Sequence, residues 1–305
     1  MDKKTQDQLI LQLGRLATET TSEEWPDWCL ESNESILQYQ LADYHRMVTS
    51  LEPVIPLLSR LIDRAVSILG NGGSVIYAGA GTSGRLGVLD SSECPPTFGV
   101  PPTMVRGVIA GGDRALRSSV EGAEDNREQA RVDYQSSSIR PEDLVIGITA
   151  SSRTPWVLEF LMAHKEVGGM TGLLVCNTTE LSAYSYVDHL LPLQAGNEMI
   201  TGSTRLKSGT LTKMVLNLFS SITFIRLGKT YKNRMVDLVA VNEKLKARAV
   251  KTMMELTALP ADECRTYLER SDFQLKTALV CHQRKVIPTV ARELIEKDPL
   301  VLYHS

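Results

Sequence analysis

The sequence predicts an α/β fold in which helices cover both faces of a doubly wound, parallel, five-stranded sheet, with helical segments flanking it at both chain ends. Three observations predict this architecture. Short apolar runs alternate with helical patterns between about residues 55 and 230. The runs are continuously hydrophobic, as in strands that are buried on both faces of a parallel sheet. Hydroxyl-rich clusters follow two of the runs and precede a helix, which is typical of α/β units.

Five runs have the length and composition of buried strands, and helical patterns alternate with them. The strands are expected at residues 74–80, 103–110, 144–150, 172–176 and 188–193. The helices are expected at residues 54–69, 83–93, 113–134, 154–167 and 203–227, and the third is expected to be mostly helical with a break at Gly122. The first helix should stop at the Gly-Asn-Gly-Gly breaker of residues 70–73. The second should stop at Pro95-Pro96, because proline lacks the amide that continues a helix.

Composition divides the chain into three predicted parts. Residues 1–54 are polar with scattered apolar positions, and we expect an N-terminal helical segment. Residues 55–230 carry the strands and form the sheet domain. Residues 231–305 are helical and charged, and we expect a C-terminal helical subdomain too polar to form a second independent core.

Charge and cysteine usage exclude several classes of partner. The 305-residue chain has 33 basic and 36 acidic side chains. It therefore lacks the excess of basic residues that is typical of a nucleic-acid-binding protein. The N-terminal stretch lacks the apolar core of a signal peptide, and no apolar run is long enough to span a membrane. The five cysteines are scattered, which favours reduced thiols over a disulfide framework. We therefore expect a cytoplasmic protein with no membrane partner.

A glycine-rich loop follows the first predicted strand. Residues 79–84 match G-x-G-x-x-G, the fingerprint of dinucleotide sites. A dinucleotide is disfavoured, because no acidic residue follows the second strand until Asp113. Gly81, Thr82 and Ser83 instead offer backbone and hydroxyls that suit a phosphate monoester at a helix N-terminus. A capped turn that binds nothing is the alternative.

Two further hydroxyl clusters lie before predicted helices. Ser151, Ser152 and Thr154 follow the strand at 144–150, with Thr154 at the expected N-cap position. Because parallel strands end at one edge of a sheet, this loop and the glycine-rich loop are expected to share an anion site.

The third cluster opens the long helix predicted at 203–227. Ser203 lies close to Arg205 and Lys207, which add two cations to the hydroxyl group. For the two cations, a solvated helix face is the alternative.

Carboxylates are the candidates for acid–base chemistry. Glu93 precedes a rigid Pro-Pro turn, and Glu121 and Glu124 follow the second strand. For each, a surface carboxylate without a role is the alternative. The five histidines show no metal-binding spacing, and neither a Walker A motif nor a GxSxG elbow occurs, so neither metal nor cofactor is predicted.

Five segments, in order, resemble the N-acetylmuramic acid 6-phosphate etherases. They contain GAGTSGRLGVLDSSECPPT, EGAEDN, TASSRTPWV, TGSTRLKSGTLTK and KTYKNRMVDLVAVNEKL, and together they cover most of residues 55–250. The family is related to the glucokinase regulatory proteins, and both contain the sugar isomerase (SIS) fold. The resemblance therefore implies the SIS fold, a phosphosugar substrate, no cofactor and a homodimer.

The resemblance also implies a reaction. Such etherases cleave the D-lactyl ether of N-acetylmuramic acid 6-phosphate to N-acetylglucosamine 6-phosphate and D-lactate. The open-chain aldehyde acidifies the proton on C2, a carboxylate removes it, lactate leaves from C3, and water adds. By motif position, Glu93 corresponds to the proton donor and Glu124 to the second catalytic carboxylate. The phosphate-binding residues correspond to Thr82 and Ser83 with Gly81, to Ser151, Ser152 and Thr154, and to Ser203.

Two other functions share this fold. A non-catalytic phosphosugar-sensing regulator is the main alternative, and an aldose–ketose isomerase is the second. Neither needs the segment that carries Glu93. The chain also departs from the family pattern, because Ser152 occupies a position where the family has glycine, and the N-terminal stretch diverges.

Overall fold

The structure is a computed structural model that describes residues 14, 16–22, 25–177, 184–237 and 243–304. The chain divides into two compact units. The first contains Met1–Ser92 and Thr103–Phe219, and the second contains Glu93–Pro102 and Ser220–Ser305. The boundaries predicted at residues 54 and 230 stay a prediction.

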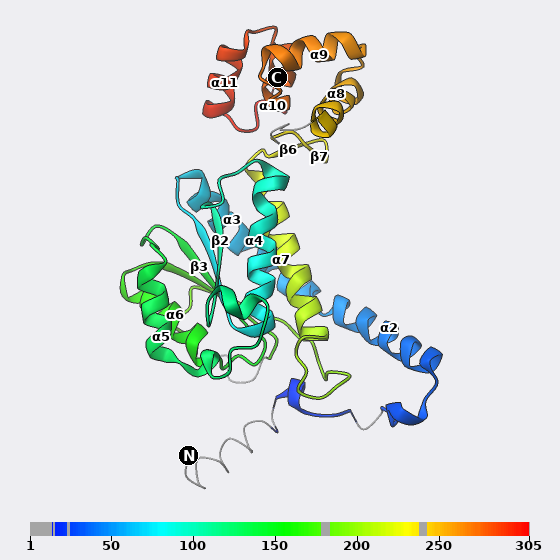
Figure 1. Ribbon diagram of the computed structural model, residues 1–305, viewed down its shortest axis with the longest axis vertical. Coiled ribbons are helices and arrows are strands. Elements are labelled where there is room, and N and C mark those ends of the chain that lie inside the picture. The colour runs from blue at the N-terminus through cyan, green and yellow to red at the C-terminus, as the bar shows by residue number, and fades with distance from the viewer. Residues whose placement is uncertain (1–13, 15, 23–24, 178–183, 238–242, 305) are drawn as a thin grey trace. The chain divides into compact units, whose positions relative to one another are not determined.

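A parallel sheet forms the centre of the first unit (Figure 1). Its strand order is β2-β1-β3-β4-β5, and every neighbouring pair is parallel. The strands are β1 (Val75–Gly79), β2 (Val105–Ile109), β3 (Leu144–Thr149), β4 (Met170–Val175) and β5 (His189–Pro192). Every residue of β1 and β3 is buried, as continuous apolar runs predict. The five predicted strands and the α/β fold class are confirmed.

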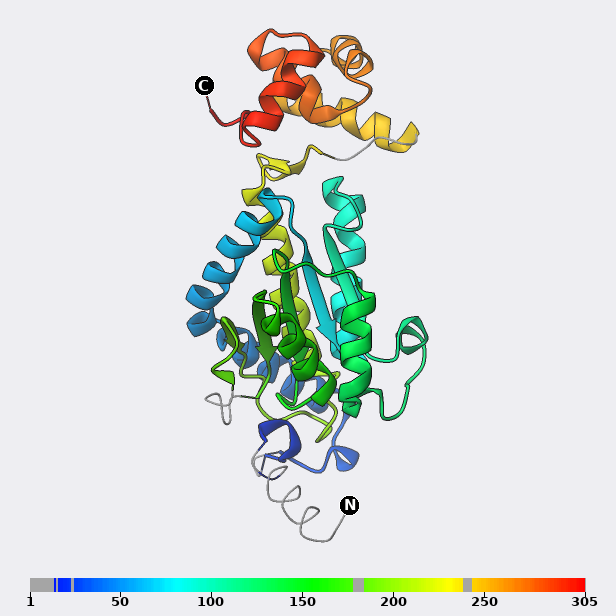
Figure 2. The ribbon, with the colours of Figure 1, turned by 90° about the vertical axis from the view of Figure 1, so that its left-hand side faces the viewer.

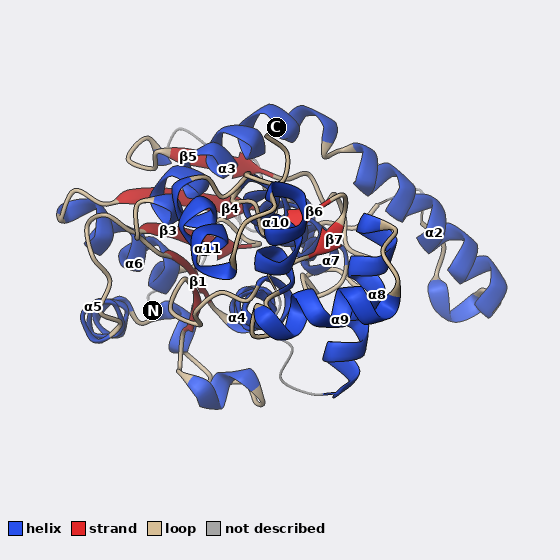
Figure 3. Ribbon diagram, turned by 90° about the horizontal axis from the view of Figure 1, so that it is seen from above, coloured by secondary structure: helices blue, strands red, loops and turns tan. Residues whose placement is uncertain are grey.

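Helices cover both faces of the sheet (Figure 3). One face packs against α5 (Arg127–Ser136) and α6 (Pro155–Glu166), where Ile76, Val145 and Phe160 share one buried cluster. The other face turns the ring of Tyr77 toward Phe219. It is covered by α3 (Ile55–Gly70), α4 (Gly81–Phe98) and α7 (Lys207–Arg226). The predicted double winding is confirmed. The N-terminal segment contributes α2 (Asn33–Thr49).

Two predicted helix boundaries are wrong. The helix expected to stop at Pro95-Pro96 continues as α4 to Phe98, because proline fixes a φ angle compatible with a helix even though it removes amide donors. Gly99 ends it, with φ of 64° and its amide on the Pro95 carbonyl at 2.9 Å.

The segment expected to be mostly helical at 113–134 is interrupted at the expected Gly122, but the part before Gly122 forms short turns and not a helix. It contains the 3-10 turns η4 (Asp113–Leu116) and η5 (Ala123–Asp125), and an α-helix begins only at Arg127. Gly111, Gly112 and Gly122 all have positive φ, which interrupts a helix. The side chain of Asn126 then caps α5 by accepting from the Gln129 amide at 2.9 Å.

Beyond the ends of α4 and α7, the described residues of the second unit form the helices coloured from yellow to red in Figure 2 and a short antiparallel pair. The elements are β6 (Thr230–Tyr231), β7 (Arg234–Met235), α8 (Glu243–Thr257), α9 (Ala261–Arg270), α10 (Leu275–Arg284) and α11 (Pro288–Lys297). Met253, Leu268 and Leu279 belong to a buried cluster of this unit. The expectation that this region is too polar for a core is wrong, because α10 is buried from Leu275 to Cys281. Each helix around it has to contribute only one apolar face to the core and can be polar on its other faces.

No helix among the described residues is both long and apolar enough to cross a membrane.

Candidate active site

The glycine-rich loop brings α4 into close contact with the end of β1. A Cβ on Gly79 would lie 2.7 Å from the Gly84 amide nitrogen, and one on Gly84 would lie 2.6 Å from the Gly79 carbonyl oxygen. Gly81 has φ of 52°, and a Cβ there would meet open space. The first turn of α4 therefore starts directly at the sheet edge, with Thr82 and Ser83 half-buried in it.

The loop after β3 lies at the same sheet edge, because β1 and β3 are hydrogen-bonded neighbours. The Thr154 hydroxyl is 2.7 Å from that of Thr149, and the Ser151 hydroxyl accepts from the Arg153 amide at 3.3 Å. Thr154 occupies the predicted N-cap position of α6 but makes no side-chain cap. The first amides of α6 therefore donate no hydrogen bond to this hydroxyl.

Ser152 differs from the other hydroxyl residues of this loop. It is 2% exposed, with φ of 64°, and its hydroxyl donates to the Asn177 carbonyl at 2.7 Å. The Tyr184 hydroxyl donates to the Ser152 carbonyl. A left-handed φ favours glycine, which explains why glycine suits this position, and the bond to Asn177 offsets part of the cost for serine.

A buried carboxylate that the sequence analysis missed organises the start of α7. Glu198 is 0% exposed and accepts from the amides of Lys207 and Ser208 at 2.8 and 2.9 Å, and from the Ser208 hydroxyl at 2.7 Å. These amides belong to the first turn of α7, where a negative charge is stabilising. Ser203 is half-buried in the turn between Glu198 and α7. The sequence signal that could have identified Glu198 is an acidic residue shortly before the start of a predicted helix, where a carboxylate can accept from the first amides.

The two cations of this cluster lie in different environments. Arg205 is exposed. Lys207 is 2% exposed, its ammonium is 2.5 Å from the Asp43 carboxylate of α2, and it lies over the Trp25 ring at 5.7 Å. The solvated-face alternative is therefore wrong for Lys207, which links the N-terminal segment to the start of α7.

The start of α7 also lies beside the glycine-rich loop. A Cβ on Gly209 would lie 3.5 Å from the Thr82 methyl group. The first turns of α4 and α7 therefore lie together in the first unit, and an anion site shared by the hydroxyl loops stays a prediction.

Glu124 lines a small cavity at the glycine-rich loop. The cavity has a volume of about 160 Å³, and Gly81, Arg85, Glu121 and Glu124 are among its lining residues. Arg85 of α4 donates to the Ala115 carbonyl at 2.9 Å, which holds the η4 turn against the helix. Arg85 was not predicted as a site residue, although it stands one turn into the helix that the loop begins.

The protonation of Glu124 is shifted by its surroundings. The side chain keeps contact with solvent, but partial burial of its carboxyl raises the pKa, and the charges of Asp125 and Glu121 raise it further. A raised pKa makes the carboxylate a stronger base for carbon-bound protons.

Glu93 lies on α4 in the second unit and is exposed. The other predicted site residues all belong to the first unit. Among the described residues, no group of three or more His, Cys, Asp and Glu side chains is arranged to hold a metal ion.

Comparisons with known proteins place this geometry in context. The family model for the glucokinase regulatory protein N-terminal SIS domain matches residues 58–165. The chain is 44% identical over 267 residues to the N-acetylmuramic acid 6-phosphate etherase of Jannaschia sp. (strain CCS1), covering 88% of this chain and 84% of that one. It is 39% identical over 285 residues to the etherase of the same name from Geobacillus thermodenitrificans (strain NG80-2), covering 93% and 96%.

One solved structure supports the fold. A phosphoheptose isomerase from Francisella tularensis matches with a TM-score of 0.50 and 15% identity, over 64% of this chain and 100% of that one. Because the identity is low, this similarity shows the SIS-type fold and no more.

Proposed function

Because the chain belongs to the family of N-acetylmuramic acid 6-phosphate etherases, we propose that it cleaves the D-lactyl ether of that phosphosugar to N-acetylglucosamine 6-phosphate and D-lactate. The structural observation that carries the proposal is the cavity shared by Gly81 and Glu124. It sets a carboxylate of raised pKa beside the loop that suits a phosphate. The comparisons favour neither the regulatory alternative nor an isomerase of this fold.

The proposed reaction is an elimination followed by an addition. The open-chain aldehyde of the sugar acidifies the C2 proton, and Glu124 removes it as the base. Glu93 donates a proton to the ether oxygen as D-lactate leaves C3. Water then adds to C3 of the unsaturated aldehyde and gives its proton to the ionised Glu93, while Glu124 returns its proton to C2. Each carboxyl group thus ends the cycle in its starting state.

The phosphate of the substrate is proposed to bind the hydroxyls and amides at the sheet edge. Gly81, Thr82 and Ser83 open α4, while Ser151 and Thr154 precede α6. Positive N-terminal dipoles and amides without intrahelical partners favour an anion at such positions. Ser203 adds a hydroxyl ahead of α7, and Ser152 contributes through the loop shape that its left-handed backbone sets.

The deciding experiment is an assay of D-lactate release from N-acetylmuramic acid 6-phosphate. We expect release by the wild type, and a loss of about a hundredfold or more for Glu124→Gln and Glu93→Gln. Glu142→Gln, an exposed carboxylate, is the matched control. Wild-type protein that binds the sugar but releases no lactate would instead support the sensor.

Labelled water tests the route. With ¹⁸O-water, the elimination mechanism places the label on C3 of the N-acetylglucosamine 6-phosphate product. Label on the hydroxyl of the released lactate would contradict it, because the ether oxygen would then have stayed with the sugar.

We also propose that the chain acts as a homodimer in the cytoplasm. Leu37, Leu41 and Val48 lie on one face of α2 and are 69%, 60% and 44% exposed, which favours a protein contact over solvent.

All five cysteines are free thiols, and burial raises the pKa of Cys176 to about 11, which suits a reducing compartment. No nucleic-acid or membrane partner is proposed. Light scattering should give twice the chain mass, with L37E/L41E lowering it and T49E leaving it unchanged.

A further inference from the structure

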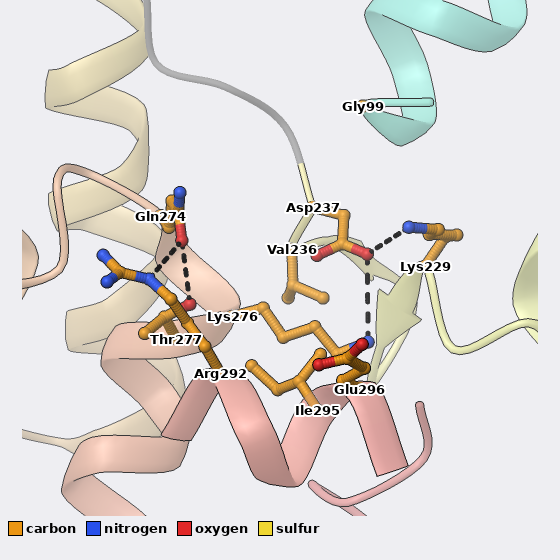
Figure 4. A pocket seen from close by; sticks show the side chains of 10 residues that line it. All are labelled: Gly99, Lys229, Val236, Asp237, Gln274, Lys276, Thr277, Arg292, Ile295 and Glu296. Atoms are coloured by element: carbon orange, nitrogen blue, oxygen red, sulfur yellow. Dashed lines mark hydrogen bonds and ion pairs between the residues drawn. The ribbon is translucent and has the colours of Figure 1, made fainter. Parts of the chain in front are cut away.

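The second unit contains a polar cavity that none of the predicted site residues lines. Its volume is about 310 Å³, at the lower end of the range for small-ligand pockets. Lys229, Lys276 and Arg292 contribute three cations to its lining, and Asp237 and Glu296 contribute two carboxylates. Figure 4 shows the side chains of Lys229, which precedes β6, and of Lys276, which lies on α10, turned toward Asp237, which follows β7.

Lys276 is the most unusual of these groups. Its side chain is 5% exposed, and its ammonium donates to the Gly228 carbonyl at 2.7 Å. The Asp237 carboxylate lies 3.8 Å away, beyond hydrogen-bond reach. An ammonium has three donors, so this group retains hydrogen-bonding capacity inside the protein.

The nearest carboxylate is already engaged. Asp237 pairs with Lys229 at 2.9 Å, and the Arg292 guanidinium pairs with Asp272 at 2.6 Å. One carboxylate thus serves two lysines at this end of the cavity. A buried ammonium that shares a distant counter-ion with a second lysine is costly, because charges lose their hydration when buried. Burial accordingly lowers the pKa of Lys276.

Glu296 does not remove this imbalance. It lines the cavity from α11 but is exposed, and no ion pair joins it to Lys276 among the residues that the structure describes. Its charge should therefore weaken, without preventing, the binding of an anion.

The remaining walls suit hydroxyl groups. The Thr277 hydroxyl donates to the Gln274 side-chain oxygen at 3.1 Å, and the Arg292 guanidinium donates to the same oxygen at 3.3 Å. The Gln274 amide nitrogen remains as a donor at this wall. Val236 and Ile295 add a small apolar surface.

We propose that this cavity binds the phosphate monoester of a small polyol or sugar, with the phosphate on Lys276 and Lys229 and the hydroxyls toward Gln274 and Thr277. A dianion suits the site better than a carboxylate, because two lysines, Lys229 and Lys276, share the single carboxylate of Asp237 at this end of the cavity. The site is distinct from the proposed etherase site, and the proposal does not rest on that activity.

Calorimetric titration of the full chain with inorganic phosphate, at constant ionic strength in chloride, tests the proposal. Lys276→Met should raise the dissociation constant of one phosphate site about tenfold or more, since a hydrogen-bonded charge is removed. Glu296→Gln should tighten the same site by about two- to fivefold, because it removes a repelling charge. Lys251→Met, on an exposed lysine of α8, is the control and should change neither.

The outcomes separate cleanly. Equal phosphate binding by Lys276→Met and wild type would overturn the proposal, as would a Lys276-dependent site that prefers D-lactate to phosphate. Glu296→Gln changes an exposed side chain. The tighter phosphate binding expected of this variant therefore tests the proposal even if Lys276→Met fails to fold. Glu124→Gln should keep the Lys276-dependent site, so a failure of the etherase activity and a failure of this site appear in different variants.

Discussion

The Glu198 carboxylate holds Ser208 by both its amide, at 2.9 Å, and its hydroxyl, at 2.7 Å, in the buried first turn of α7. With the Lys207 amide, this makes three donors for one buried charge. The carboxylate thereby satisfies amides that a helix start leaves without partners. It also joins the two ends of the turn that carries Ser203, because Glu198 precedes that turn and Lys207 follows it.

Replacing Glu198 by glutamine should destabilise the first unit. The amide group keeps one oxygen but turns donor hydrogens toward backbone N–H groups, so charge-assisted bonds are lost and we expect a cost of about 2–3 kcal/mol. Urea denaturation measures the free energy of unfolding. Glu142→Gln, at an exposed position, should change it by less than about 0.5 kcal/mol. Equal effects of the two variants would contradict the assigned role.

Two substitutions at Ser152 should separate its backbone from its hydroxyl. Ser152→Ala keeps a side chain at positive φ and loses the bond to the Asn177 carbonyl, so we expect a loss of about 1–2 kcal/mol. Ser152→Gly loses the same bond but removes the strain of a side chain at a left-handed φ, which should restore about 1 kcal/mol of stability. Thermal unfolding should therefore rank wild type and Ser152→Gly close together, both above Ser152→Ala. The reverse order of the two variants would refute the argument.

The buried imidazole of His164 should make stability depend on pH. Its Nε2 donates to the Asp143 carbonyl at 3.0 Å, so Nδ1 accepts from the Tyr134 hydroxyl at 3.0 Å. Burial lowers the pKa of His164 below its ordinary value, although the Asp143 carbonyl acts in the opposite direction. The unfolded chain then binds a proton at higher pH than the folded one.

The contribution of His164 to stability is therefore complete above about pH 6.5 and is lost as the pH falls below that value, at up to about 1.4 kcal/mol per pH unit. Denaturation of wild type and His164→Gln between pH 5 and 8 should show this slope in the wild type and a shallower one in the variant. His45→Gln, on an exposed histidine, is the control. Parallel curves for all three proteins would count against the assignment.

The acid limb of lactate release should report Glu124. A base must be ionised, so kcat/KM should rise with pH through the raised pKa of Glu124, above its ordinary value near 4.5. Asp125→Asn removes a charge that raises this pKa, so the limb should move to lower pH. Glu128→Gln, an exposed change on α5, should leave the limb in place. A limb unmoved by Asp125→Asn would argue against Glu124 as the base.

The strands were predictable because their signal is local. Runs such as Val75–Gly79 are apolar without alternation, and burial on both faces of a parallel sheet requires that composition. The hydroxyl loops were predictable for the same reason, because they directly follow those strands. The end of α4 was not, since the helix passes through the two prolines and ends at Gly99, whose positive φ is set by the folded backbone.

The sequence by itself determined the α/β class, the five strands and the family, because periodicity, loop composition and similarity are properties of neighbouring or aligned residues. Only the tertiary structure decided which side chains hold the site: Glu198 on Ser208, Lys207 on Asp43, and the Ser152 hydroxyl on Asn177. The cavity around Lys276 was likewise decided by folding. The physical reason is that the burial of a polar group, and the partner that compensates it, depend on segments far apart in the chain, which no local pattern records.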